Sequence, residues 1–204
     1  PNTSSAASDV YKRQYRSRLS KRADNSNTQF ALLALHEAAM VGVETSQEVW
    51  RRAQTYWLNQ QHSSGGFGYV AGNLPSGSMT CAGISSLIIV EENLGETLPV
   101  VNGRLQCCSP QDDSLALRRA IEFWGTRFAA RFNPTGPNDV GKHYLFYYLY
   151  GVERAGRLSG RRFFGDHDWY REGVDYLLQR QQPVSGAWVG ASQIAEAQGA
   201  VSYT

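Results

Sequence analysis

A turn built on glycine and an aromatic residue occurs twice in the chain, and this repeat limits what the sequence can fold into more than any single residue does. Its three fixed residues recur 121 positions later (182 − 61): Gln61 as Gln182, Gly65 as Gly186 and Phe67 as Trp188. A Ser-x-Thr triplet begins at positions 26, 78 and 202, and the last two starts lie 124 positions apart (202 − 78). Both spacings are two steps of about sixty residues, and self-similarity at a fixed period indicates a repeat architecture.

Two kinds of helical segment alternate along the chain. One kind is apolar on nearly every side, as expected of a helix buried all round, and comprises residues 28–42, 78–94 and 141–156. The other kind is amphipathic and comprises residues 46–61, a segment from 114 onward and a segment capped by Asp166 and Asp168. For the third amphipathic helix we expect an inward-facing stripe of Tyr170, Val174, Leu177 and Leu178.

Successive hairpins of this kind bury their apolar faces on their neighbours. The sequence therefore predicts an all-α barrel, with the apolar helices inside and the amphipathic helices around them. No stretch shows sustained period-two alternation, so we expect little strand.

The two ends of the chain do not follow this pattern. Residues 1–14 read as a translated sequencing adapter, and we leave them out of the fold. Residues 15–23 are basic and aperiodic, which predicts a solvated lead-in. The hairpin pattern covers residues 24–204 as a partial domain. We expect this domain to be truncated at both ends, with further parts of the protein missing.

Composition excludes several classes of protein. The formal net charge of +2 gives no indication of nucleic-acid binding. No apolar run approaches the roughly 20 residues of a membrane-spanning helix. The three cysteines cannot all pair, which argues against a disulfide-stapled secreted fold. Together these features favour a soluble, cytoplasmic protein.

Both copies of the turn fit the pattern Gln-x-x-x-Gly-x-Phe/Trp, which resembles the QW motif of the squalene cyclase and prenyltransferase superfamily. That superfamily includes bacterial proteins with prenyltransferase/squalene-oxidase repeats. The resemblance covers roughly residues 24–204 and implies an α/α toroid, here as a partial ring. We expect a structural role for both copies. The glutamine amide would satisfy free backbone groups at the end of an outer helix, and the ring would stack across the glycine.

The acidic DxDDT-like segment that starts catalysis in squalene-type cyclases is matched only in part. Asp24 and Thr28 align with its ends, but Ser26 and Asn27 stand where the family has two further aspartates. A hydroxyl and an amide supply no acidic proton near neutral pH, so we expect this segment to be a helix cap with a hydrogen-bonding inner rim. No group of cysteines, histidines and carboxylates has the spacing of a metal site, and we expect neither a metal nor a cofactor.

Residues near the expected helix starts could line the mouth of an aromatic cavity that binds a hydrophobic small molecule. The candidates are Asp24, Asn27, Thr28, Thr80, His143, Tyr144 and Tyr147. The alternative is that the tyrosines pack between the inner and outer layers.

Three functions remain open at this stage. The first is a toroid domain without standard catalysis that binds a hydrophobic ligand or a partner through its central cavity. The second is a terpenoid cyclase of the squalene type whose catalytic acid lies outside this sequence. The third is a polysaccharide lyase-like toroid, because Asp24, Asn25 and Thr28 loosely resemble a segment of some pectate lyases.

Overall fold

The computed structural model describes residues 23–95, 100–101, 104–105, 113–135 and 144–189. His143 and the helix start expected near residue 202 lie outside these ranges, as does most of the lead-in. The described helices are α2 (Asn25–Met40), α3 (Gln47–Gln60), α4 (Gly77–Leu94), α5 (Leu115–Gly125), α6 (Leu145–Ser159) and α7 (Trp169–Arg180). The described strands are β1 (Val100–Val101), β2 (Arg104–Leu105), β3 (Phe163–Phe164) and β4 (His167–Asp168), paired as two short antiparallel ribbons.

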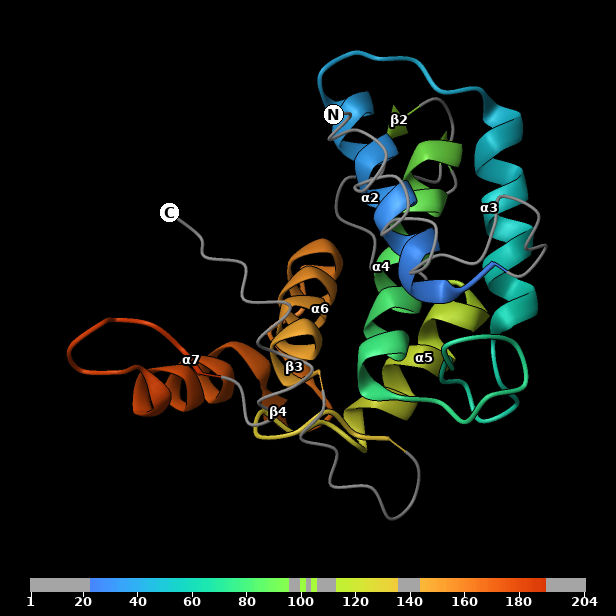
Figure 1. Cartoon of the computed structure of the whole chain (residues 1–204). Helices are drawn as coiled ribbons and strands as arrows, with labels where there is room; N and C mark the ends of the chain where they lie inside the picture. The colour runs from blue at the N-terminus through green and yellow to red at the C-terminus, as the bar shows by residue number, and fades with distance from the viewer. Residues whose placement is uncertain (1–22, 96–99, 102–103, 106–112, 136–143, 190–204) are drawn as a thin grey trace, which may run out of the picture.

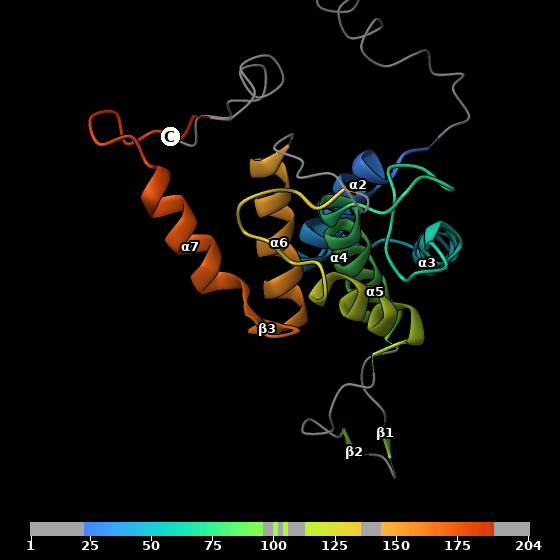
Figure 2. The same ribbon diagram turned by 90° about the horizontal axis from the view of Figure 1, so that it is seen from below.

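Helix α4 lies in the middle of the molecule and packs against α2, α3, α5 and α6. Figures 1 and 2 show α6 on one side of it, α3 on the other, and α7 at the edge beyond α6. The three helices predicted to be apolar, α2, α4 and α6, are therefore neighbours in space although amphipathic helices separate them in the sequence. The expected all-α class is confirmed for the described part of the chain.

The sequence of α4 explains its central place. From Gly77 to Glu91 every residue is buried except Ile88, which is half-buried. Its small residues let neighbouring groups approach closely, because the ring of Phe67 lies directly against Gly83 and no Cβ would fit there. On its opposite side, Cys81 lies against Gly151 of α6. The prediction of a helix buried all round is confirmed for α4.

For α2 that prediction is wrong. Only one face of α2 is buried, whereas Phe30 is 44% exposed and Met40 is 70% exposed. The physical reason is position: α2 packs against α4 and, through Gln29 and Phe30, against α6, and no described helix covers its opposite face.

The expected inward stripe of α7 is also wrong. None of the residues of α7 is buried, and Tyr170 and Leu178 are 64% and 65% exposed. The helix begins after the β3–β4 ribbon, and its N-cap is Asp168 alone, whose side chain accepts a hydrogen bond from the Arg171 backbone N–H. Helix α7 contacts α6 but has no inner helix on its other side in the described residues.

Substitution of Phe67, whose ring packs on α4 at Gly83, tests this packing directly. We expect Phe67→Ala to lower the free energy of unfolding by about 3–5 kcal/mol, because it removes a fully buried ring and leaves a cavity beside Gly83. The exposed counterpart in the second turn, Trp188→Ala, should cost only about 1–2 kcal/mol, since the ring is 42% exposed. Urea unfolding curves of the two variants measure both values, and equal costs would contradict the asymmetry.

Candidate functional site

The N-terminal end of α2 carries a compact hydrogen-bonded cap. Both carboxylate oxygens of Asp24 accept hydrogen bonds from Asn27, one from its backbone N–H at 2.8 Å and one from its side-chain amide at 2.7 Å. Thr28 donates its hydroxyl to the Asp24 carbonyl oxygen at 2.7 Å. Three of the predicted site residues thus form one N-cap, in which the carboxylate also meets the positive end of the helix dipole.

Tyr147 of α6 joins this end of α2 to α6. Its hydroxyl lies 2.9 Å from the Ser26 hydroxyl and accepts a short hydrogen bond from the Gln29 side-chain amide. Burial raises the pKa of Tyr147, the hydrogen bonds with Ser26 and Gln29 lower it, and the charge of Asp24 raises it again. The group therefore stays a neutral phenol and acts as a hydrogen-bonding link between α2 and α6.

A second link, which the sequence reasoning missed, ties α2 to α3 and to the glycine-aromatic turn. Asn25 is fully buried, and its side-chain oxygen accepts a hydrogen bond from the Tyr56 hydroxyl at 2.9 Å. Its amide nitrogen donates to the Gly68 carbonyl oxygen at 2.8 Å, and its backbone N–H donates to the Tyr69 carbonyl oxygen at 2.9 Å. A buried asparagine must be satisfied in this way, which is the signal that could have identified it.

An aromatic seam runs between α2 and α6 next to Tyr147. We define it as Phe30, Tyr147 and Tyr150. The ring of Phe30 lies 6.2 Å from that of Tyr147 and stacks on that of Tyr150 at 6.1 Å with an interplanar angle of 20°. The guanidinium of Arg154 lies over the Tyr150 ring at 5.2 Å. The seam therefore presents an apolar surface with a cation at one end and the Asp24 cap at the other.

Two further candidates do not join this site. Thr80 is fully buried, and its hydroxyl oxygen accepts the Phe67 backbone N–H at 3.2 Å, so it fixes the turn and cannot line a cavity mouth. Tyr144 precedes α6 with a left-handed backbone (φ 57°) and is 59% exposed. His143 lies outside the described residues.

The first glycine-aromatic turn places its glutamine between α3 and α5. The Gln61 amide donates to the Gly65 carbonyl oxygen and to the Ala116 carbonyl oxygen of α5, both at 2.8 Å. Phe67 is fully buried, and its ring meets that of Trp57 at 5.6 Å in an edge-on arrangement. This turn therefore connects α3, α4 and α5.

In the second turn a different glutamine makes the corresponding bond. The amide that donates to the Gly186 carbonyl oxygen, at 2.9 Å, belongs to Gln181 and not to Gln182. The reason is that α7 ends at Arg180, 120 positions after the end of α3 (180 − 60), while the glycine follows 121 positions after Gly65 (186 − 65). The second turn is one residue longer. Trp188 donates its indole N–H to the Leu177 carbonyl oxygen at 2.7 Å.

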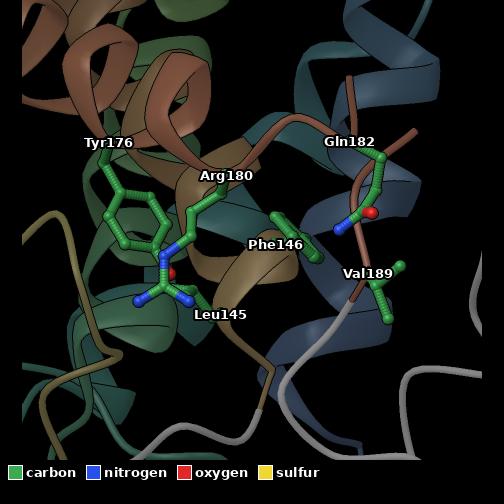
Figure 3. A pocket seen from close by; sticks show the side chains of 6 residues that line it. All are labelled: Leu145, Phe146, Tyr176, Arg180, Gln182 and Val189. Carbon is green, nitrogen blue, oxygen red and sulfur yellow. The ribbon is translucent and has the colours of Figure 1, made fainter. Parts of the chain in front are cut away.

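A hollow of about 110 Å³ lies between α6 and α7. It is lined by Leu145, Phe146, Tyr176, Arg180, Gln182 and Val189. Figure 3 shows Tyr176 and Arg180 on one side of it and Gln182 and Val189 on the other, with Phe146 between them. The guanidinium of Arg180 lies 5.5 Å from the centre of the Tyr176 ring.

Within the described ranges, no three histidine, cysteine or carboxylate side chains are grouped so that they could hold a metal ion. None of the helices in those ranges is both long and apolar enough to span a membrane. Comparison of the chain with protein-family models, with curated proteins and with solved structures finds no match.

Removal of one hydroxyl tests the link between α2 and α6. Tyr147→Phe leaves the Gln29 amide and the Ser26 hydroxyl without their shared partner, and we expect a loss of about 1–3 kcal/mol in the free energy of unfolding. Tyr144→Phe, at the exposed neighbouring tyrosine, is the matched control and should change it by less than about 0.5 kcal/mol. Similar values for the two variants in chemical denaturation would show that the network adds no stability.

Alkaline pH provides a second test. Burial raises the pKa of Tyr147 and also that of Tyr148, whose hydroxyl accepts the Trp124 indole N–H at 3.1 Å. An unfolded tyrosine has a pKa of about 10. The folded state thus binds these protons more tightly, so its stability is complete below about pH 10 and falls as the pH rises towards the higher folded pKa values. The midpoint of urea unfolding should decrease from pH 9 to pH 11, and this decrease should be smaller in Tyr148→Phe.

Proposed function

We propose that residues 24–189 form an arc of an α/α toroid like that of the squalene cyclase and prenyltransferase superfamily, and that the arc binds an apolar small molecule without catalysis of its own. The order of the helices supports this proposal. Helices α2, α4 and α6 contact one another, and α3 and α5 pack on α4, as neighbouring hairpins of such an arc would. The glycine-aromatic turns lie at the ends of the outer helices α3 and α7.

The observation that carries the proposed binding function is the aromatic seam. Phe30 is 44% exposed although its ring stacks on Tyr150, and Tyr147 and Tyr150 are half-buried, so part of the aromatic seam is open to solvent. An exposed apolar patch of this kind marks a binding surface more often than a scattered single residue does. The Asp24 carboxylate and the Tyr147 hydroxyl lie at one end of the seam, where they would orient a ligand that has an apolar body and a hydroxyl head.

The hydrogen bonds of Asp24 support a role in ligand binding and not in proton donation. Both of its oxygens accept hydrogen bonds from Asn27, an arrangement that suits a carboxylate and leaves further lone pairs that can accept from a ligand hydroxyl. An acid that initiates alkene cyclisation must hold a proton and direct it at the substrate. We therefore assign Asp24 to capping and ligand orientation.

Farnesol, which combines an apolar chain with a hydroxyl group, is a suitable probe. In isothermal titration we expect saturable binding to the wild-type protein and an affinity about 10-fold to 100-fold weaker for Phe30→Ala, as a lost aromatic contact of about 1.5–3 kcal/mol implies. Leu58→Ala, an exposed apolar residue on α3, is the control and should bind as the wild type does.

Two results would contradict this proposal. If the wild-type protein shows no saturable binding, or if Phe30→Ala and Leu58→Ala bind equally well, the seam is not the binding surface. Incubation with squalene or farnesyl diphosphate separates binding from catalysis, because a cyclised product would identify a terpenoid cyclase.

A further inference from the structure

Three buried polar atoms on α2, α4 and α6 have no hydrogen-bond partner in the part of the chain that the structure describes. They are Nδ1 of His36, Oγ of Ser85 and Nε of Arg154, and we call these three residues the polar trio. His36 is 9% exposed and Ser85 is 2% exposed. A buried polar group without a partner destabilises the folded state, so native proteins rarely keep one without a reason. The trio is therefore suited to a ligand that supplies these hydrogen bonds.

The hydrogen bond between Gln29 and Tyr147 places two members of the trio on facing sides of α2 and α6. These helices run in the same direction, because this hydrogen bond near their starts is followed on both by the stacked rings of the aromatic seam. His36 comes seven residues after Gln29 (36 − 29), and Arg154 comes seven residues after Tyr147 (154 − 147). Seven residues are close to two full helical turns, so each returns to the face of the residue before it. His36 and Arg154 therefore lie at the same level, on the faces that α2 and α6 turn toward each other.

The contacts between α4 and α6 place Ser85 at this level too. Near the helix starts, Gly77 lies against the ring of Tyr148. Further along both helices, Cys81 lies against Gly151, so α4 and α6 also run in the same direction. Ser85 follows Cys81 by four residues and therefore lies on the same face of α4, about one turn beyond this contact. The arginine of the trio lies three residues beyond the same contact on α6, so all three members occupy one level of three packed helices.

The guanidinium of Arg154 carries a positive charge that its own helix only partly neutralises. Its ion-pair partner in the described ranges is Glu153, whose Oε2 lies 3.5 Å from Nε, beyond the length of a normal hydrogen bond. Glu153 also pairs with Arg157 at 3.1 Å, so one carboxylate meets two guanidiniums. The Arg154 side chain is 33% exposed, which leaves it within reach of a ligand. Hydrogen-bond donors beside an excess positive charge favour a carboxylate, whose two oxygens accept from several donors at once.

We propose that the polar trio binds the carboxylate group of the ligand whose apolar body lies on the aromatic seam. This inference rests on the proposed function and adds the second polar end of the ligand. The hydroxyl end of the ligand lies at Asp24 and Tyr147, and Arg154 follows Tyr147 by seven residues, which is about 10 Å along the helix. The ligand class is therefore a medium-chain carboxylic acid that carries a hydroxyl group at its other end.

Isothermal titration of the full chain with two probes of equal chain length, ω-hydroxydecanoate and decanol, tests the proposal. Both probes have the apolar body and the hydroxyl group, and only the first has the carboxylate. We expect ω-hydroxydecanoate to bind about 10-fold or more tightly than decanol, because hydrogen bonds to charged groups are the stronger ones. Arg154→Gln should remove this preference. Arg157→Gln, which alters the other ion pair of Glu153, is the matched control and should retain it.

Ser85→Ala separates a binding role from a structural one. The substitution removes a buried hydroxyl that has no partner in the described ranges, so the midpoint of urea unfolding of the free protein should stay the same or rise. Binding of ω-hydroxydecanoate should weaken by about 3-fold or more, since the carboxylate loses one donor, while binding of decanol should not change. A hydroxyl with a purely structural role would give the opposite result, with a lower midpoint and unchanged binding of both probes.

The outcomes distinguish this inference from the proposed function on which it rests. If the two probes bind the wild type equally well, or if Arg154→Gln keeps the preference for the carboxylate, the polar trio is not a carboxylate site, although the seam can still bind farnesol and decanol. If neither probe nor farnesol binds, both proposals are wrong. A preference that is lost in Arg154→Gln and kept in Arg157→Gln supports the inference. Circular dichroism melts confirm that each variant is folded.

Discussion

The described fold depends on the contact between the ring of Phe67 and the backbone of α4 at Gly83. The ring is fully buried, and the absence of a side chain at Gly83 lets it lie directly on the helix. The Phe67 backbone N–H donates to Thr80, and the adjacent Gln61 amide reaches Ala116 at the start of α5. One short turn therefore fixes α4 relative to α3 and α5, and α2 and α6 pack on α4 in turn.

Sequence patterns predicted the parts of this arrangement that follow from local rules. An 18-residue apolar helix with small residues has to be buried, so the central place of α4 could be read from its sequence. The repeat also located both turns. The repeat spacing assigned the hydrogen bond to the Gly186 carbonyl oxygen to Gln182, but Gln181 makes it. The spacing gives positions in the sequence only, whereas the hydrogen bond depends on where the helix ends. Helix α7 ends one position earlier relative to its glycine, so Gln181 takes the role that the spacing gave to Gln182.

The candidate site shows the same division between local and long-range information. Asp24, Asn27 and Thr28 were identified because a helix N-cap involves residues that are close together in the sequence. The expected hydrogen-bonding rim included Asn25 and Ser26, but the links of Ser26, Gln29 and Asn25 to α6 and α3 were not predicted because the partners are distant in the sequence. The sequence feature that could have indicated them is a group of polar residues at the start of an otherwise apolar helix, because a polar side chain that is buried needs a hydrogen-bond partner. Thr80 was predicted to line a cavity mouth, but its hydroxyl accepts a hydrogen bond from the Phe67 backbone N–H in the turn. The periodicity of a helix does not show whether a residue at its start points to a cavity or to a neighbouring turn.

The difference between the two hairpins indicates how stability is distributed along the chain. In repeat proteins each unit gains most of its stability from the interface with the next unit. Helix α3 has that interface, and Trp50 and Trp57 are 2% and 0% exposed, whereas α7 has no buried residue at all. Both helices have amphipathic sequences, so the contrast comes from the neighbour and not from the helix itself. The burial of an amphipathic helix therefore depends on the helix packed beside it, and among the described hairpins the one formed by α6 and α7 gains the least from such a contact.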